Sequence, residues 1–160
     1  MAGIGVDAQV VKELNPWMKG IFGKLAYPFS ALRTLSHYDP PELKIEIGEG
    51  EQSITGYAAV VCNSMHYGGK YKLCPFAMID DGWLDLCILQ KRDIASIIRS
   101  GITVLSDHRL YGKGLKYYRV KSLCVSSSQE VPIQADGDII GATPAKFSVI
   151  PNALRIMVPA

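Results

Sequence analysis

Two acidic turns contain the residues best suited to chemistry. The first runs Ile79-Asp80-Asp81-Gly82-Trp83-Leu84-Asp85, where adjacent carboxylates and nearby backbone carbonyls can converge on one point. Such a turn suits Mg²⁺, which takes few protein oxygens and keeps several of its waters. From spacing alone, an ordinary solvated turn between two strands remains the more common explanation.

The second acidic turn is Gln134-Ala135-Asp136-Gly137-Asp138, in which two carboxylates flank a glycine. A carboxylate beside a substrate hydroxyl and a metal-bound phosphate can act as a general base, a role typically worth ~10²–10⁴-fold in rate. Asp-Gly is also the ordinary sequence of a hairpin turn that requires positive φ. On spacing alone the structural explanation is again the more common one.

Strand patterns account for most of the remaining chain. Short apolar or alternating runs recur about every ten residues with turn residues between them, as in antiparallel sandwiches and barrels. The predicted strands are Leu43 to Ile47, Ile54 to Asn63, Leu84 to Gln90, Tyr117 to Val125, Val131 to Ala135, Ala145 to Ile150 and Leu154 to Val158.

Helical periodicity is confined to a few stretches. One helix is expected from the Asn15-Pro16 start to Leu25, and a short one around Ser30 to Ser36. Another is expected from Asp93 to Leu105. The fold class is therefore mainly β, an antiparallel β-sandwich with two or three appended helices.

Composition sets the broad class. The 160 residues form one domain, 1–160, with 48% hydrophobic and 20% charged residues, which excludes a disordered chain. A net charge of +2 with intermixed signs argues against nucleic-acid binding. Apolar runs far below ~20 residues and single, strand-embedded cysteines predict a cytoplasmic protein with buried reduced thiols. The apolar, glycine-bearing start Ala2 to Ala8 suggests the interior of a longer chain.

An ordered series of motifs resembles the C-terminal domain of bacterial diacylglycerol kinases and their sphingosine and ceramide kinase relatives. The similarity extends over nearly the whole chain. The segments that carry it are Ala2 to Ala8, Gly23 to Tyr27, Cys62 to Gly69, Leu73 to Ala77 leading into Asp80 to Asp85, Gln134 to Asp138, Thr143-Pro144 and Ile150 to Arg155.

The resemblance implies a lipid kinase whose active cleft lies between this β-sandwich and an α/β N-terminal domain. It places Mg²⁺ on the Asp81 carboxylate and the backbone carbonyls of Met78 and Trp83, with water completing the shell. It places the catalytic carboxylate at Asp138 or Asp136. The family usually has glutamate where this chain has Asp138, so the choice between the two stays open.

The resemblance also implies partners. ATP would be bound mainly by the N-terminal domain, because the Gly-Gly-Asp-Gly-Thr motif of that domain is absent from these residues. We expect a lipid substrate, peripheral membrane contact in the full-length enzyme, and an isolated chain that is inactive. An apolar surface facing the other half would favour a homodimer.

Two alternatives belong to different classes. One is a non-catalytic lipid-binding or interaction module on the same sandwich. The other is a relative of NAD kinase, whose two-domain plan is similar but whose signature motifs are not evident here. The sequence does not select diacylglycerol, a sphingoid base, ceramide or phosphatidylglycerol as the acceptor.

Overall fold

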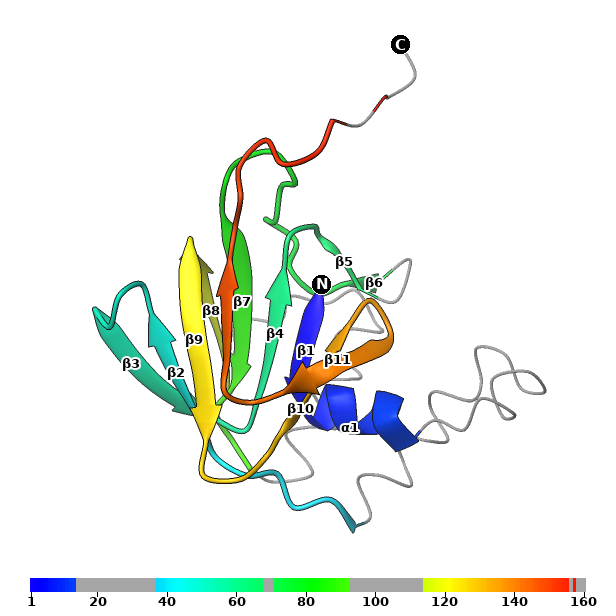
Figure 1. Cartoon of the computed structure of the whole chain (residues 1–160), viewed down its shortest axis with the longest axis vertical. Coiled ribbons are helices and arrows are strands. Elements are labelled where there is room, and N and C mark those ends of the chain that lie inside the picture. The colour runs from blue at the N-terminus through cyan, green and yellow to red at the C-terminus, as the bar shows by residue number, and fades with distance from the viewer. Residues whose placement is uncertain (14–36, 68–70, 93–113, 156, 158–160) are drawn as a thin grey trace, which may run out of the picture.

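Antiparallel strands dominate the computed structural model, which describes residues 1–13, 37–67, 71–92, 114–155 and 157 (Figure 1). The elements are β1 (Ala2–Gly5), α1 (Val6–Glu13), β2 (Leu43–Ile47), β3 (Gln52–Gly56), β4 (Ala58–Cys62), β5 (His66–Tyr67), β6 (Tyr71–Lys72), β7 (Leu84–Leu89), β8 (Leu115–Val120), β9 (Ser122–Ser127), β10 (Pro132–Ala135), β11 (Asp138–Ala142) and β12 (Ala145–Ser148).

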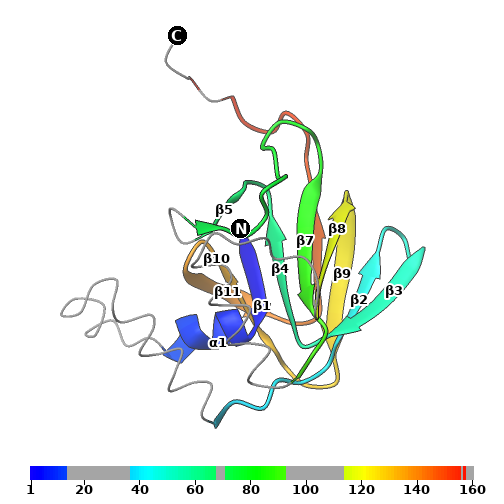
Figure 2. The ribbon, with the colours of Figure 1, turned by 180° about the vertical axis from the view of Figure 1, so that it is seen from behind.

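Two sheets make the sandwich, and Figures 1 and 2 show them from opposite sides. The larger sheet has six strands in the order β11-β10-β1-β4-β7-β8, and the smaller has four in the order β12-β9-β2-β3. A two-stranded ribbon, β5-β6, stands apart from both. The predicted mainly β, sandwich-like class is confirmed.

The main core lies between the two sheets and draws on both. Strand β7 shows how alternation builds it, because Leu84, Leu86 and Ile88 all point into this core. Burying each such aliphatic side chain stabilises the fold by about 1.5–3 kcal/mol. The intervening residues of β7, Asp85 and Cys87, face the other side of the six-stranded sheet.

A second, smaller cluster occupies that other side. It consists of Cys62, Leu73, Cys74, Ala77 and Cys87, so residues of the loop after β6 cover the strands β4 and β7. The Sγ atoms of Cys74 and Cys87 are 3.5 Å apart. All four cysteines are free, and three of them are buried, as the strand-like surroundings predicted.

Two predicted strands are each two strands of different sheets. The run from Ile54 to Asn63 divides at Tyr57, where β3 of the small sheet gives way to β4 of the large one, and the Tyr57 N–H donates to Leu89 O at 2.8 Å. The run from Tyr117 to Val125 divides at Lys121 in the same way. Both predictions were wrong in one respect, because a chain can cross between sheets without interrupting its apolar pattern.

One further predicted strand is wrong, and the predicted helices fall on residues that the structure does not describe. The predicted strand from Leu154 to Val158 is wrong at Leu154 and Arg155, which are irregular, and Leu154 is 83% exposed. The three helices expected from Asn15, Ser30 and Asp93 lie outside the described residues. No helix among the described residues is long and apolar enough to cross a membrane.

Candidate functional site

The two acidic turns lie at the same end of the six-stranded sheet. Ala135 pairs with Ala2, Ala2 with Val61, and Val61 with Leu86, so β10, β1, β4 and β7 share one level at this end. The acidic hairpin follows β10, and the acidic turn precedes β7. Three strand spacings of ~4.8 Å place their bases about 14 Å apart, close enough to border one large ligand but too far to touch.

The acidic turn is closed by the side chain of Asp81. Its Oδ1 accepts a hydrogen bond from the Trp83 N–H at 2.9 Å, the local bond with which aspartate stabilises a turn. Its Oδ2 accepts a hydrogen bond from the guanidinium of Arg119 on β8. The Asp81 side chain is only 12% exposed, which strengthens this ion pair relative to one at the surface.

Asp85 lies behind Asp81 and is fully buried. It stands directly opposite Arg119 in the β7–β8 register, and Tyr117 lies two residues before Arg119 on the same face. Asp85 Oδ1 accepts a hydrogen bond from the Tyr117 hydroxyl, and Arg119 Nε is 4.0 Å from the same oxygen. Asp85 Oδ2 is buried without a hydrogen-bond partner among the described residues. Burial raises the pKa of the Asp85 carboxyl, Arg119 opposes the rise, and Asp81 adds to it.

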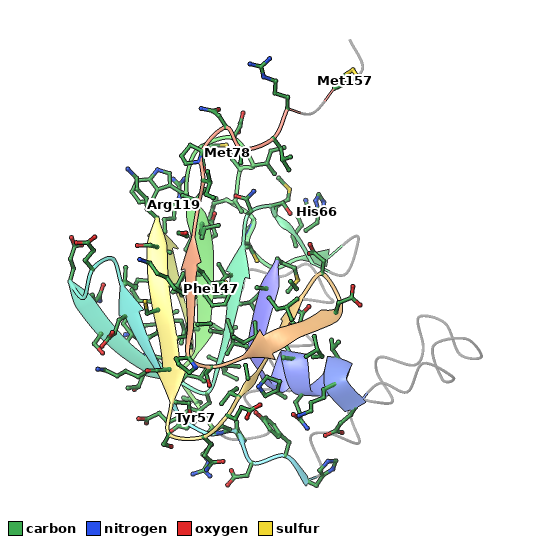
Figure 3. All side chains as sticks on the ribbon, in the orientation of Figure 1. Tyr57, His66, Met78, Arg119, Phe147 and Met157 are labelled. Atoms are coloured by element: carbon green, nitrogen blue, oxygen red, sulfur yellow. The ribbon has the colours of Figure 1, made fainter. Side chains whose placement is uncertain are left out.

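The indole of Trp83 carries two cations. Arg119 Cζ is 5.6 Å and Lys121 Nζ is 5.0 Å from its ring centroid, both within the range of a cation–π contact. Figure 3 shows Arg119 and Met78 towards the upper end of the sheets and Tyr57 at the opposite end. The acidic turn is therefore a network of two carboxylates, two cations and an aromatic ring.

The donor atoms of this turn suit a hard cation in kind. Asp81 offers a carboxylate beside backbone carbonyls, and the buried Asp85 Oδ2 is an oxygen acceptor without a partner in the described structure. No group of three or more His, Cys, Asp or Glu side chains gathers as a metal site within the described ranges. Mg²⁺ does not need one, because water fills most of its shell. The donor atoms of the turn are therefore of the kind that magnesium takes, while Arg119 holds one of the two Asp81 oxygens in this structure.

The acidic hairpin is an Asp-Gly turn, as the sequence predicted. Asp136 has φ 48° and Gly137 has φ 99°, the left-handed values that a two-residue hairpin of this kind requires. The Asp136 side chain is 80% exposed, and its Oδ1 lies 2.7 Å from the amino nitrogen of Met1. Asp138 is exposed, and no hydrogen bond to its carboxylate occurs among the described residues.

Gln134 holds the hairpin from beneath. It is 3% exposed, its Nε2 donates to Asp7 Oδ2 of α1 at 2.6 Å, and its Oε1 accepts the Gly137 N–H at 2.9 Å. Gly3, opposite Gln134 in the register, leaves the room for this bridge, since a Cβ there would lie 1.7 Å from Asp7 Oδ2. The base of the hairpin is thereby connected to a helix 127 residues away in the sequence.

The structure brings some predicted site residues together and adds others. Asp81 and Trp83 are joined by a hydrogen bond, whereas Met78 precedes them in the turn with a 54% exposed side chain. The hairpin that carries Asp136 and Asp138 begins about 14 Å farther along the sheet edge, by strand spacing.

Asp85 and Gln134 stand in the two acidic turns but had no predicted role, and Arg119 was not predicted as a site residue. An acidic residue within the buried run of β7 was the available signal for Asp85. Arg119 had none, because its contacts depend on the register between β7 and β8.

Comparison with known proteins finds a matching domain family and relatives that are named as lipid kinases. Residues 1–158 match the model of the YegS C-terminal NAD kinase beta sandwich-like domain. The chain is 26% identical to a diacylglycerol kinase of Bacillus subtilis, over 99% of the chain and 52% of the relative. It is 24% identical to a protein of Chromohalobacter salexigens named "Probable lipid kinase YegS-like", over 99% of the chain and 51% of that protein.

A solved structure supports the fold. The crystal structure of a diacylglycerol kinase from Bacillus anthracis superposes with a TM-score of 0.65 at 21% identity, covering 94% of this chain and 48% of that one. The chain thus spans about half the length of the curated relatives it matches, and these relatives are kinases by name. With a family model matched over residues 1–158, the chain belongs to the family of YegS C-terminal, NAD kinase β-sandwich-like domains.

Proposed function

We propose that this chain is the C-terminal half of an ATP- and Mg²⁺-dependent lipid kinase that phosphorylates the hydroxyl of diacylglycerol or a related lipid. The observation that carries the proposal is the match over nearly the whole chain to lipid kinases twice its length. The acidic hairpin and the acidic turn at one end of the sheet supply the two kinds of carboxylate that such a reaction uses.

Asp138 is the general base in this proposal. Its carboxylate is exposed and accepts no hydrogen bond from the described residues. The base takes the proton of the lipid hydroxyl while the hydroxyl oxygen bonds to the γ-phosphorus of ATP. The bond from that phosphorus to the β–γ bridging oxygen breaks, and ADP leaves. Asp136 is the alternative base if the hairpin turns its tip towards the substrate.

The acidic turn holds Mg²⁺ in this proposal. Asp81 would contribute its carboxylate, and Met78 and Trp83 would contribute backbone carbonyls. A bound Mg²⁺ would supply positive charge and rigidity at the edge of the cleft. The residues of the turn keep the Asp81 carboxylate in place, since the Trp83 N–H holds one of its oxygens.

Exposed apolar side chains border both acidic turns. Met78 and Ile79 precede Asp81 with 54% and 62% exposure, and Ile139 and Ile140 follow Asp138 with 43% and 61%. Apolar surface of this kind is what a lipid acceptor or a second protein half would cover. ATP would be held mainly by the N-terminal half, since this sequence contains no phosphate-binding glycine loop.

The test is an assay of ATP-dependent phosphorylation of diacylglycerol. The chain alone should be inactive, and adding a separately expressed N-terminal half of a relative should restore activity. Robust activity from the chain alone would contradict the division of roles. Failure of every lipid in a panel of diacylglycerol, sphingosine, ceramide and phosphatidylglycerol, with both halves present and bound to each other, would contradict the activity itself.

The exposed apolar side chains also predict self-association of the isolated chain. Sizing at increasing protein concentration should show a dimer that dissociates when the N-terminal half is added. A monodisperse monomer at high concentration would contradict this. Peripheral membrane contact is tested separately, by co-sedimentation of the two-half enzyme with vesicles that contain diacylglycerol.

A further inference from the structure

The guanidinium of Arg119 donates a hydrogen bond to Asp81 Oδ2, one of the two oxygens that Asp81 could offer to a metal ion. We propose that Arg119 is an internal cation that competes with Mg²⁺ for Asp81, and that Asp85 receives its guanidinium when the ion is bound. This inference rests on the proposed role of Asp81 in holding Mg²⁺. It adds a residue from β8 that sets the affinity of the site for the metal.

Competition follows from the occupancy of the Asp81 oxygens. Oδ1 accepts the Trp83 N–H, and Oδ2 accepts the Arg119 guanidinium. A dication bound to this carboxylate would stand within a few ångströms of a permanent positive charge, in a place where Asp81 is only 12% exposed. Water screens such repulsion weakly at a largely buried carboxylate, so the ion and the guanidinium exclude each other.

Asp85 provides the second place for the guanidinium. Its Oδ2 is buried and lacks a hydrogen-bond partner among the described residues, and its Oδ1 is 4.0 Å from Arg119 Nε. A short movement of the guanidinium would turn the 4.0 Å contact between Nε and Oδ1 into a direct hydrogen bond. In a two-bond, side-on arrangement a second guanidinium nitrogen would then donate to Oδ2, the buried acceptor that lacks a partner among the described residues. The ring of Trp83, 5.6 Å from Arg119 Cζ, supports the cation in its present position and would remain near it after such a movement.

Lys121 provides a matched control. Its Nζ lies 5.0 Å from the centroid of the same Trp83 ring, so it carries the same charge in the same neighbourhood. It makes no ion pair with a carboxylate within the described part of the chain. A general effect of positive charge on Mg²⁺ should therefore appear in variants of both residues, whereas competition for Asp81 should appear only at Arg119.

The first experiment is calorimetric titration of the chain with MgCl₂. Arg119→Gln should lower the dissociation constant for Mg²⁺ by about tenfold or more, because a charge in contact with the ligand oxygen is gone. Arg119→Lys, which keeps the charge, should stay near the unaltered chain, and Lys121→Gln should change the constant less than about twofold. Equal affinities for Arg119→Gln and the unaltered chain would overturn the proposal.

A second measurement uses only the unaltered chain, so it does not depend on whether a variant folds. In the unaltered chain, saturating Mg²⁺ should shift the NMR resonance of the Arg119 Nε–H group as its partner changes from Asp81 to Asp85. The Arg92 Nε–H group, paired with Asp39, should not move. An unmoved Arg119 resonance at saturation would overturn the exchange even if Mg²⁺ binds.

Failure of this inference is distinguishable from failure of the metal assignment. If Mg²⁺ binds, requires Asp81, and ignores Arg119, competition is wrong and the magnesium site stands. If no variant binds Mg²⁺, or Asp81→Ala binds it as well as the unaltered chain does, the magnesium site itself is wrong and competition falls with it. Asp85→Asn adds a check, since it should weaken Mg²⁺ binding when Arg119 is present and have little effect in Arg119→Gln.

Discussion

The acidic turn before β7 and the acidic hairpin after β10 contain the same residue types at one end of one sheet, yet their carboxylates have opposite surroundings. Asp85 is fully buried and Asp81 is 12% exposed, and both are engaged by groups from β8. Asp136 is 80% exposed, and Asp138 accepts no hydrogen bond from the described residues. The carboxylates of the acidic turn are therefore engaged by partners within the domain, whereas Asp138 of the acidic hairpin is exposed to a reactant.

This difference indicates which region can do which work. A carboxylate held by an N–H group and a guanidinium keeps its position and can hold an ion once the guanidinium moves away, but it is poorly available to take a proton from a substrate. An exposed carboxylate on a rigidly anchored hairpin can reach a substrate hydroxyl. If the two regions are separate in this way, a change in one of them should leave the role of the other intact.

The largest expected effect is on catalysis at the hairpin. Asp138→Asn should lower the turnover of the two-half enzyme by about 10²–10⁴-fold, because the base is lost, while the melting temperature stays unchanged. Asp136→Asn is the matched variant and should cost much less. If Asp136→Asn has the larger effect on turnover, the base is Asp136 and the assignment to Asp138 is wrong.

The next largest effect is expected at Gln134, which anchors the acidic hairpin. Gln134→Leu should lower the free energy of unfolding by about 2 kcal/mol, because Asp7 and the Gly137 N–H lose a buried partner. Gln52→Leu makes the same change at an exposed position of β3 and should stay within about 0.5 kcal/mol. Urea unfolding measures both. Equal effects would mean that the hairpin is not held through Gln134.

The acidic turn should respond to Asp81→Ala. Without Mg²⁺ the variant should lose about 1 kcal/mol, since the bonds to Trp83 and Arg119 disappear from a partly buried site. With Mg²⁺ the gap should widen, because only the unaltered chain gains stability from binding. Asp80→Ala, at the exposed neighbour, should keep the Mg²⁺ response in a thermal melt. A Mg²⁺ response that survives in Asp81→Ala would remove Asp81 from the metal site.

The smallest expected effect concerns the thiols packed behind the acidic turn. Hydrogen bonds with Cys62 and Cys87, together with burial, raise the pKa of Cys74 far above that of an ordinary thiol. These three thiols should resist a thiol reagent at neutral pH until the domain opens, while the half-buried Cys124 reacts sooner. Asp81→Ala should speed their labelling slightly, and Asp136→Ala should not. Equal acceleration by both variants would show that the two regions open together.

Much of the sandwich was predictable from local patterns. Leu43 to Ile47 alternates, and Asp136-Gly137 demands a hairpin, so each element follows from its own residues. The crossings at Tyr57 and Lys121 were not predictable in this way, because an apolar run continues unchanged while the chain passes from one sheet to the other. The irregular tail at Leu154 shows the opposite case, an apolar segment without a strand partner among the described residues.

The sequence by itself determined the strand-rich class, the two acidic turns and the family to which they belong, because turn chemistry and alternation act over a few neighbouring residues. Only the tertiary structure decided which carboxylates are engaged. Arg119 meets Asp81, and Gln134 meets Asp7, through strand register and a contact between segments far apart in the chain. Burial and pairing of a charge depend on such contacts. Aspartate is therefore buried and hydrogen-bonded within the domain in one turn and exposed in the other.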